Sequence, residues 1–182
     1  MTSAAHGEYG NGDNDIAWSN YDWGYYNKIS NGSNQEKIWR TLSKNEWEYL
    51  VLMRDNASDK QSFAKINDVF GHILLPDEWT LPIGLTFSTN IFDLPNEYTY
   101  KEWQQMEASG AVFLPASGYR DELFVGQTNE CSYYWTSSYH RTGYLADIGQ
   151  YAYSMNFHTS YAYTKYHARY MGASVRLVQD VK

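Results

Sequence analysis

The segment from Tyr133 to Tyr170 holds ten of the eighteen tyrosines of the chain and three of its five histidines. It contains no glutamate and a single lysine, Lys165. A packed core does not need so many tyrosines, because each buried phenol must find a hydrogen-bond partner. Tyrosine interleaved with His, Ser, Asn and Thr is typical of binding surfaces, where rigid rings supply contact area and small polar groups supply hydrogen bonds. We therefore expect the rest of the chain to support this surface.

The length and composition fit a single domain with a short arm. The 182 residues are 43% hydrophobic, and seven Trp and seven Phe supply large packing units for a core. Residues 1–15 are rich in Gly, Asn, Asp and Ser and are expected to form a flexible N-terminal arm. Residues 16–182 are expected to form the folded domain, with the tyrosine-rich region at about residues 133–178.

Charge, cysteine content and hydropathy exclude several classes of protein. The net charge of −7 argues against nucleic acid or an anionic membrane as the main partner. Cys131 is the single cysteine, which excludes an intrachain disulfide and a thiolate metal cluster. No apolar run is long enough to insert into a membrane. The N-terminus lacks the features of a signal peptide, so either the protein is not exported by that route or the chain is a piece of a longer protein.

Two capping boxes predict two helices. The first helix begins at residues 43–46, where Ser and Glu can cap each other's backbone amides, and ends at residues 55–56. The second begins with the same arrangement at residues 99–102 and ends at Gly110, a glycine in the C-terminal cap position. Tryptophans beside these and other blocks (Trp18, Trp39, Trp47, Trp79 and Trp103) are expected to pack in the core rather than stack on sugars.

Short apolar or alternating runs predict strands at residues 70–75, 111–115, 133–138, 152–158 and 174–178, whereas residues 62–69 fit either a strand or a turn. In the run 152–158, alternation places Tyr153, Met155 and Phe157 on an inward face. The opposite, outward face then carries Ser154, Asn156 and His158. Helices early in the chain, short strands late and long irregular connections predict an α+β fold.

Five blocks in chain order carry a family resemblance: Trp39–Ser43 with Glu46, Trp47 and Leu50; Ile73–Asp77 with Trp79; Met106–Ala108 with Gly110–Ala116 and Gly118–Arg120; Tyr134–Ser138; and Gly172–Val178. Together they resemble the C-type-lectin-fold domains of gut Bacteroidales and their phages, related to the formylglycine-generating-enzyme type of that fold. The blocks run from about residue 23 to residue 178. The resemblance implies a C-type lectin fold, with two helices packed on short antiparallel strands and long irregular connections.

Some members of that group resemble the variable proteins of diversity-generating retroelements. In those proteins a reverse transcriptase rewrites template adenines, so that asparagine-type codons become codons for Tyr, His, Asp, Ser, Thr, Ala, Gly or Arg. The composition of residues 139–170 is similar to that output. The resemblance implies a hypervariable ligand-binding protein: a phage receptor-binding tip on a virion tail, or an adhesin on a bacterial cell surface. A cell-surface protein or glycan is then the expected partner, and a homotrimer the expected assembly.

The predicted ligand-contact surface consists of the positions left after the core-facing ones are removed. Its members are Tyr139, His140, Tyr144, Tyr151, Ser154, Asn156, His158, Tyr161, Tyr163, Tyr166, His167 and Tyr170. The alternative is that tyrosine is simply favoured in strands, with several phenols half-buried there. We favour that alternative, a core position, for Tyr134 and Tyr153.

The sequence predicts no catalytic residue, no cofactor and no metal. The histidines lack a metal-ligand spacing. Asp121 and Glu122 are adjacent and would point apart on a strand, which makes a poor carboxylate pair. Formylglycine-generating enzymes need a cysteine pair, and Cys131 stands alone. We therefore expect a binding protein that is not an enzyme. The alternatives are an enzyme of the formylglycine-generating type with an atypical centre, and a structural or adhesive module without diversification.

Overall fold

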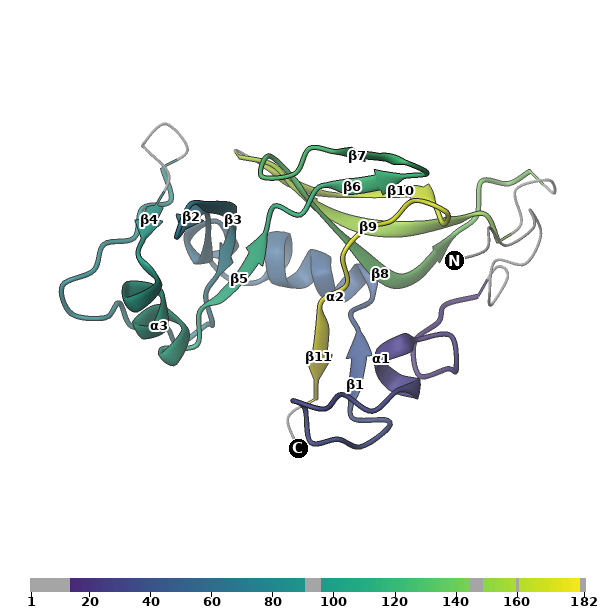
Figure 1. Cartoon of the computed structure of the whole chain (residues 1–182), viewed down its shortest axis with the longest axis horizontal. Helices are drawn as coiled ribbons and strands as arrows, with labels where there is room; N and C mark the ends of the chain where they lie inside the picture. The colour runs from purple at the N-terminus through teal and green to yellow at the C-terminus, as the bar shows by residue number, and fades with distance from the viewer. Residues whose placement is uncertain (1–13, 91–95, 145–148, 160, 181–182) are drawn as a thin grey trace. The chain divides into compact units, whose positions relative to one another are not determined.

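A computed structural model describes residues 14–90, 96–144, 149–159 and 161–180 (Figure 1). Most of the expected N-terminal arm, residues 1–13, lies outside the described residues, as do residues 145–148 and 160 of the tyrosine-rich region. The described chain is mixed α/β, with few helices and several small sheets, as expected for an α+β protein. It divides into two compact units: the described residues within Met1–Trp47, Tyr134–Met155 and Thr164–Lys182, and those within Glu48–Tyr133 and Asn156–Tyr163.

The N-terminal half begins with the helix α1 (Trp23–Tyr26) and the strand β1 (Trp39–Thr41), followed by helix α2 (Lys44–Glu48), a π-helical turn η1 (Tyr49–Met53) and a 3₁₀ turn η2 (Ala57–Lys60). The middle of the chain contains β2 (Gln61–Ile66), β3 (Val69–Leu74), β4 (Asn96–Tyr98), α3 (Tyr100–Ala108), β5 (Val112–Pro115), β6 (Tyr119–Asp121) and β7 (Phe124–Gly126). The last strands are β8 (Ser132–His140), β9 (Tyr151–Phe157), β10 (Ala162–Ala168) and β11 (Leu177–Gln179). The strands β8, β9 and β10 form a sheet of order β10-β9-β8.

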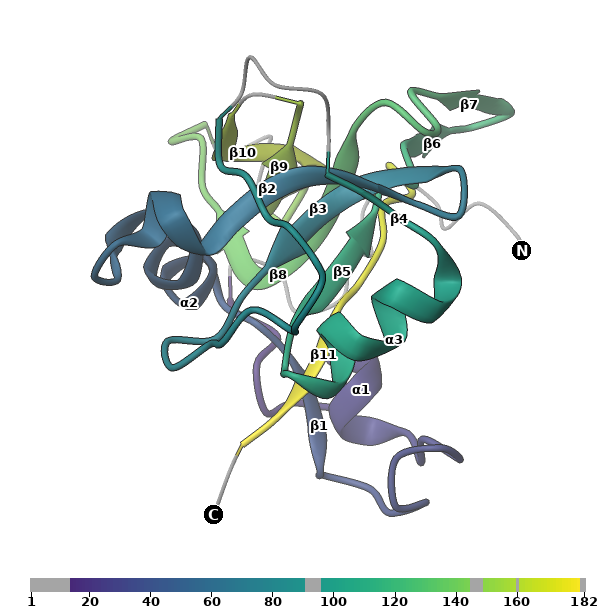
Figure 2. The same cartoon turned by 90° about the vertical axis from the view of Figure 1, so that its left-hand side faces the viewer.

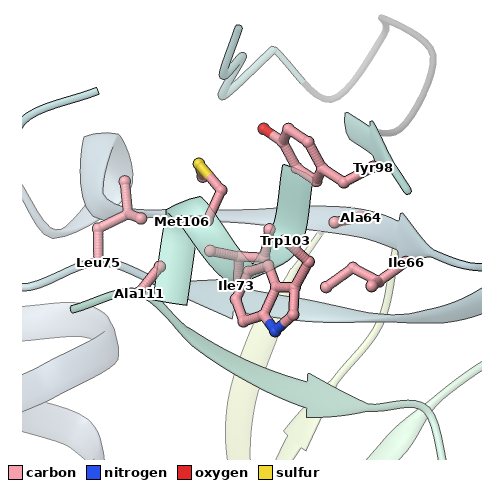
Figure 3. Packing of buried hydrophobic residues seen from close by; sticks show 8 residues of the cluster. All are labelled: Ala64, Ile66, Ile73, Leu75, Tyr98, Trp103, Met106 and Ala111. Carbon is pink, nitrogen blue, oxygen red and sulfur yellow. The ribbon is translucent and has the colours of Figure 1, made fainter. Parts of the chain in front are cut away.

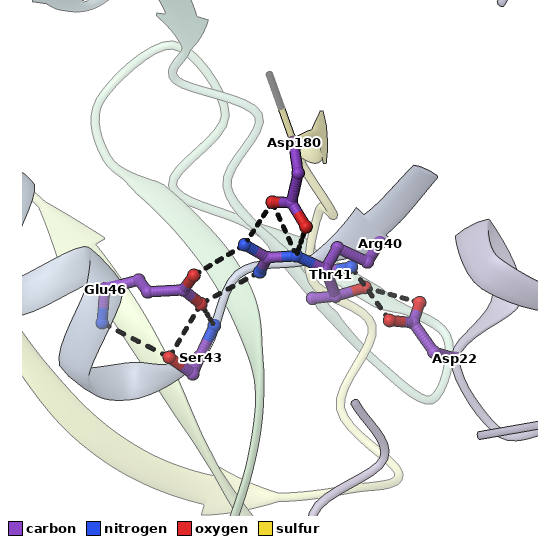
Figure 4. Close-up of polar contacts among 6 residues, drawn as sticks. All are labelled: Asp22, Arg40, Thr41, Ser43, Glu46 and Asp180. Carbon is purple, nitrogen blue, oxygen red and sulfur yellow. Dashed lines mark hydrogen bonds and ion pairs between the residues drawn. The ribbon is translucent and has the colours of Figure 1, made fainter. Parts of the chain in front are cut away.

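In the first unit, a buried carboxylate holds α1 beside β1. Asp22 is the N-cap of α1, and its side chain accepts a hydrogen bond from the Gly24 amide at 3.2 Å. It also accepts hydrogen bonds from the Thr41 amide and hydroxyl, each at 2.9 Å (Figure 4). Strand β1 pairs antiparallel with β11, so that Thr41 lies opposite Leu177. A Cβ on Gly24 would come within 2.4 Å of a Leu177 methyl carbon, so a larger residue here would have to displace the leucine side chain. The sequence predicted no helix here, and α1 spans only four residues.

The first capping box is confirmed at the start of α2. The Ser43 amide and hydroxyl both donate to the Glu46 carboxylate at 2.8 Å, and the Glu46 amide donates back to the Ser43 hydroxyl at 3.3 Å. The same carboxylate accepts two bonds from the Arg40 guanidinium, which also contacts Asp180 at 2.7 Å near the other end of the chain (Figure 4). Arg40 of β1 therefore connects the start of α2, through Glu46, to Asp180, the residue after β11.

In the second unit, a four-stranded sheet of order β4-β2-β3-β5 supports the core. Strands β2 and β3 form a hairpin whose turn residues, Asn67 and Asp68, both have positive φ (47° and 70°), as a two-residue hairpin turn requires. This resolves residues 62–69 as a strand and turn. The pairing of β2 with β4 is parallel, so the expectation of antiparallel strands is wrong at this edge. The crossing connection from β3 to β4 contributes Trp79, Leu85 and Phe87 to the core.

Helix α3 closes this core against the sheet. Its capping box joins Thr99 and Glu102 as predicted, and its cap residue Ser109 is followed by Gly110 at φ +93°. Trp103 and Met106 of the helix belong to one buried cluster with Ile73 of β3 (Figure 3). The full cluster is Ala64, Ile66, Ile73, Leu75, Tyr98, Trp103, Met106 and Ala111. Figure 2 shows α3 beside β4 and β5.

The expected role of the tryptophans is only partly correct. Trp47 and Trp103 are buried, and Trp47 lies 6.1 Å from the ring of Tyr134, which is itself buried as expected. Trp18 is 52% exposed, with the Arg40 guanidinium 5.0 Å from its ring. Trp18 is therefore not a core residue, and its ring is contacted by the Arg40 guanidinium and, edge-on at 5.5 Å, by the ring of Tyr25.

Candidate functional site

The central strand β9 corrects the predicted binding surface. Ser154 and Asn156 were expected to face outward, yet both are 0% exposed. Their inward-facing neighbours Met155 and Phe157 are buried as expected, so both faces of this part of the strand are covered. The expected outward orientation of Ser154 and Asn156 is wrong because polar side chains were equated with exposure, whereas buried polar groups are accommodated when they are hydrogen-bonded.

Four aromatic residues of the first unit form a cluster, here called the His140 cluster: His140 on β8, Tyr151 and Tyr153 on β9, and Tyr166 on β10. The imidazole of His140 stacks on the ring of Tyr166, with centroids 3.9 Å apart and planes at 11°. The edge of Tyr151 meets the same tyrosine at 5.7 Å and 89°. His140 Nδ1 lies 2.8 Å from the Tyr153 hydroxyl. Burial lowers the pKa of His140 below its ordinary 6.5, so the ring is neutral at about pH 7.

A second stack, here called the His158 cluster, lies in the second unit. His158, Tyr161 and Tyr163 are mutually stacked, with centroid distances of 4.7, 5.7 and 5.6 Å and interplanar angles between 10° and 28°. Tyr133 meets His158 edge-on at 6.4 Å and donates its hydroxyl to the Gln127 side chain. Burial raises the pKa of Tyr133 to about 12, so it remains a phenol. The three stacked rings of His158, Tyr161 and Tyr163 thus lie against Tyr133, whose hydroxyl is held by Gln127.

The remaining predicted residues are distributed outside these clusters. Tyr144 and Tyr170 are exposed, and neither has a ring contact to the two clusters. His167 is half-buried, and burial, with a contribution from Lys165, lowers its pKa. Tyr139 is half-buried, its amide donates to the Asp15 carboxylate at 3.0 Å, and its side chain lines a cavity of the first unit.

The sequence interpretation missed the supporting members of both clusters. Tyr153 was assigned to the core, but it is half-buried, bonds His140 and lies 5.3 Å below the Lys44 ammonium group. Tyr133 was treated only as a strand residue, and Cys131 only as a lone thiol. The one available signal for Tyr133 and Tyr153 was the density of tyrosine itself, because ring stacking across strands leaves no fixed spacing in the sequence.

Cys131 does have a neighbour: its sulfur lies 3.0 Å from His158 Nδ1. Burial raises the pKa of the Cys131 thiol and lowers that of the His158 imidazole. Both shifts favour the neutral thiol and neutral imidazole over a thiolate–imidazolium pair. The pair is therefore a partly buried polar contact between Cys131 and the His158 cluster, and its electrostatics do not favour an activated nucleophile.

Within residues 14–90, 96–144, 149–159 and 161–180, no group of three or more His, Cys, Asp or Glu side chains is arranged to hold a metal ion. None of the helices in those ranges has the length and apolar character needed to span a bilayer. Neither the family models, nor the curated proteins, nor the solved structures gave a match to this chain.

Proposed function

We propose that this chain is a binding protein, not an enzyme, that recognises a protein or glycan on a cell exterior through the His140 and His158 clusters. The observation that carries the proposal is the combination of stacking and exposure at Tyr166 and Tyr161. Their rings are held by histidine stacks at 3.9 and 4.7 Å, yet they remain 44% and 56% exposed. A tyrosine ordered before binding loses little side-chain entropy on contact, which favours affinity.

The chemistry of the clusters supports a macromolecular or glycan ligand. Both clusters present neutral rings and hydroxyl groups, because burial lowers the pKa values of His140 and His158. Flat exposed rings can cover apolar surface of a protein or the faces of a sugar, while the hydroxyls donate and accept hydrogen bonds. Small clusters of this kind bind weakly alone, so display of several copies, as on a trimeric fibre, would raise avidity.

A glycan and cell-surface protein array tests this function, with the chain displayed on a multivalent scaffold. Tyr161→Ala and Tyr166→Ala are expected to weaken binding to an array ligand by about ten-fold or more, the effect of losing an aromatic anchor. Tyr49→Ala in the second unit and Tyr26→Ala in the first are matched controls, since their rings are 54% and 55% exposed. A double variant at Tyr161 and Tyr166 that binds like the controls would refute the proposal.

The fold and origin are part of the same proposal. The C-type lectin fold, and diversification of about residues 133–178 by a retroelement, are supported by the resemblance of the five sequence blocks and by the composition of residues 139–170. The carrier would be a phage tail fibre or a bacterial adhesin. The genomic test is a near-copy of the coding DNA for residues 133–178 that differs at adenines and lies beside a reverse transcriptase gene. If both are missing from the source genome, the diversification proposal fails and an undiversified adhesive module replaces it.

A further inference from the structure

A cavity of about 510 Å³ opens in the first unit, apart from the stacked rings of the two clusters. Its walls come from β8, from the segment around α1, and from residues before and within β11. In both views α1 lies beside β1, and β11 runs along β1 (Figures 1 and 2). A volume of this size is typical of sites for small molecules.

The walls of the cavity are mainly apolar. Trp23, Trp135, Val175 and Leu177 contribute the large surfaces, and Trp23 remains 64% exposed at its rim. Large exposed apolar groups around a hollow mark binding sites. The walls therefore favour a ligand with a flat or compact apolar body.

Two polar features give the cavity a direction. Arg169 is the one formally charged residue among the described residues that line it, and its Nε–H donates to the Tyr151 carbonyl at 3.2 Å, which fixes the base of the guanidinium. Ser137 also lines the cavity, and its hydroxyl is buried with no hydrogen-bond partner in the described part of the chain. Because buried polar groups are normally paired, this unpaired hydroxyl is the second polar feature of the wall.

We propose that this cavity binds a small amphiphilic anion, with an apolar ring body between Trp23, Trp135 and Leu177 and a carboxylate or sulfonate directed at Arg169. A chain with a net charge of −7 does not attract anions in general. A preference of this cavity for an anionic over a neutral ligand therefore has to come from the positive charge of Arg169. The inference is independent of the proposed macromolecular recognition, because neither Tyr161 nor Tyr166 lines the cavity.

Two fluorescent probes that share one ring system test the proposal on the full chain. 1-Anilinonaphthalene-8-sulfonate carries the anionic group, and N-phenyl-1-naphthylamine lacks it. The sulfonate is expected to bind saturably at one site, about five- to ten-fold more tightly than the neutral probe, as a charge-assisted contact predicts. Ala152→Leu, which adds bulk to the cavity wall, is expected to weaken both probes.

The role of the charge is tested by Arg169→Gln. This variant is expected to lose the preference for the sulfonate while binding the neutral probe within about two-fold of the original chain. Arg120→Gln is the matched control, because Arg120 also donates its Nε–H to a backbone carbonyl, that of Glu122 at 2.8 Å, but lies outside the cavity. Arg169→Lys keeps the positive charge and is expected to keep the preference for the sulfonate. It replaces the glutamine variant as the test if that variant does not fold.

Three results would overturn the proposal. One is equal affinity of the original chain for the two probes. Another is an Arg169→Gln variant that keeps the preference as Arg120→Gln does. The third is weak, non-saturable binding of the sulfonate at many sites, which is the behaviour of loosely packed apolar surface rather than of a formed cavity.

Discussion

The imidazole of His140 and the phenol ring of Tyr166 lie face to face, 3.9 Å apart between centroids. His140 ends β8, and Tyr166 belongs to β10, so the contact reaches across the position of the central strand β9. Tyr153 of β9 joins it through the hydrogen bond to His140 Nδ1 at 2.8 Å. One side chain from each of the three strands therefore meets at this point. The environment of His140 consequently depends on how the three strands are paired.

We expect Tyr166→Ala to raise the pKa of His140 toward its ordinary 6.5. Burial lowers that pKa, because desolvation disfavours the charged imidazolium, and removal of the stacked ring readmits water. The measurement is a pH titration of the histidine ring signals by NMR. Tyr170→Ala, which removes an exposed ring that does not stack on His140, is the control and should leave the titration unchanged. An unmoved His140 pKa in Tyr166→Ala would mean that the stack does not shield the imidazole.

The Arg40–Glu46 pair is expected to stabilise the first unit. The two side chains meet at 2.6 Å, and the Arg40 side chain is only 11% exposed. We expect Arg40→Met to lower the free energy of unfolding by about 1–3 kcal/mol, between the values for exposed and buried ion pairs. In a double-mutant cycle, coupling of Arg40 to Glu46 should exceed its coupling to Asp180, whose side chain is 54% exposed. Equal couplings would contradict this ranking.

The same pair should respond to acid. Burial acts to raise the pKa of Glu46, but hydrogen bonds from Arg40 and Ser43 outweigh it, and the pKa lies below its ordinary 4.5. A carboxyl group with a lowered pKa in the folded state stabilises the protein above that ordinary value, and the contribution is lost as the pH falls through the folded-state pKa. The difference in urea unfolding between the original chain and Glu46→Gln should therefore shrink at acid pH. A difference that stays constant down to about pH 3 would count against the ion pair.

His72 should make the second unit lose stability as the pH falls. Gln61 donates its amide N–H groups to backbone carbonyls, so its side-chain oxygen faces His72 and accepts from Nε2–H at 3.0 Å. Full burial lowers the pKa of His72 to about 3, while the unfolded chain binds a proton near pH 6.5. Between these values the free energy of unfolding should fall by about 1.4 kcal/mol per pH unit. His72→Gln should remove this slope in urea titrations at several pH values, and an unchanged slope would assign it to other groups.

Gly118 should tolerate no side chain. It has φ +64°, and a Cβ there would lie 2.1 Å from the Gly126 carbonyl oxygen, so Gly118→Ala adds a clash with backbone to the cost of the left-handed conformation. Gly84 has φ +87°, and no atom lies within 4 Å of an added Cβ. Gly84→Ala therefore measures the cost of the left-handed conformation without a clash. We expect Gly84→Ala to cost about 1 kcal/mol and Gly118→Ala at least about 2 kcal/mol more, measured by urea unfolding. Equal losses of unfolding free energy in the two variants would show that the backbone around Gly118 relaxes to remove the clash.

Local signals predicted where α2 and α3 begin, but not α1. The capping boxes at Ser43 and Thr99 are interactions between residues three apart, so the sequence contains both partners of each. The strand β10 was missed because its residues, AYTKYHA, show neither an apolar run nor a clean alternation. The last strand was expected at residues 174–178 but begins at Leu177, since its position is set by pairing with β1 rather than by its own residues.

By itself, the sequence determined an α+β chain with two capped helices and a tyrosine-rich region unlike an ordinary core. Only the tertiary structure decided which of those side chains face solvent. It buried Ser154 and Asn156 on the central strand, and it gathered His140 with Tyr166 and His158 with Tyr161. It also surrounded a cavity with residues as distant in sequence as Trp23 and Arg169. The reason is physical: capping is a contact between near neighbours, whereas burial and ring stacking depend on strand pairings that no short stretch of sequence contains.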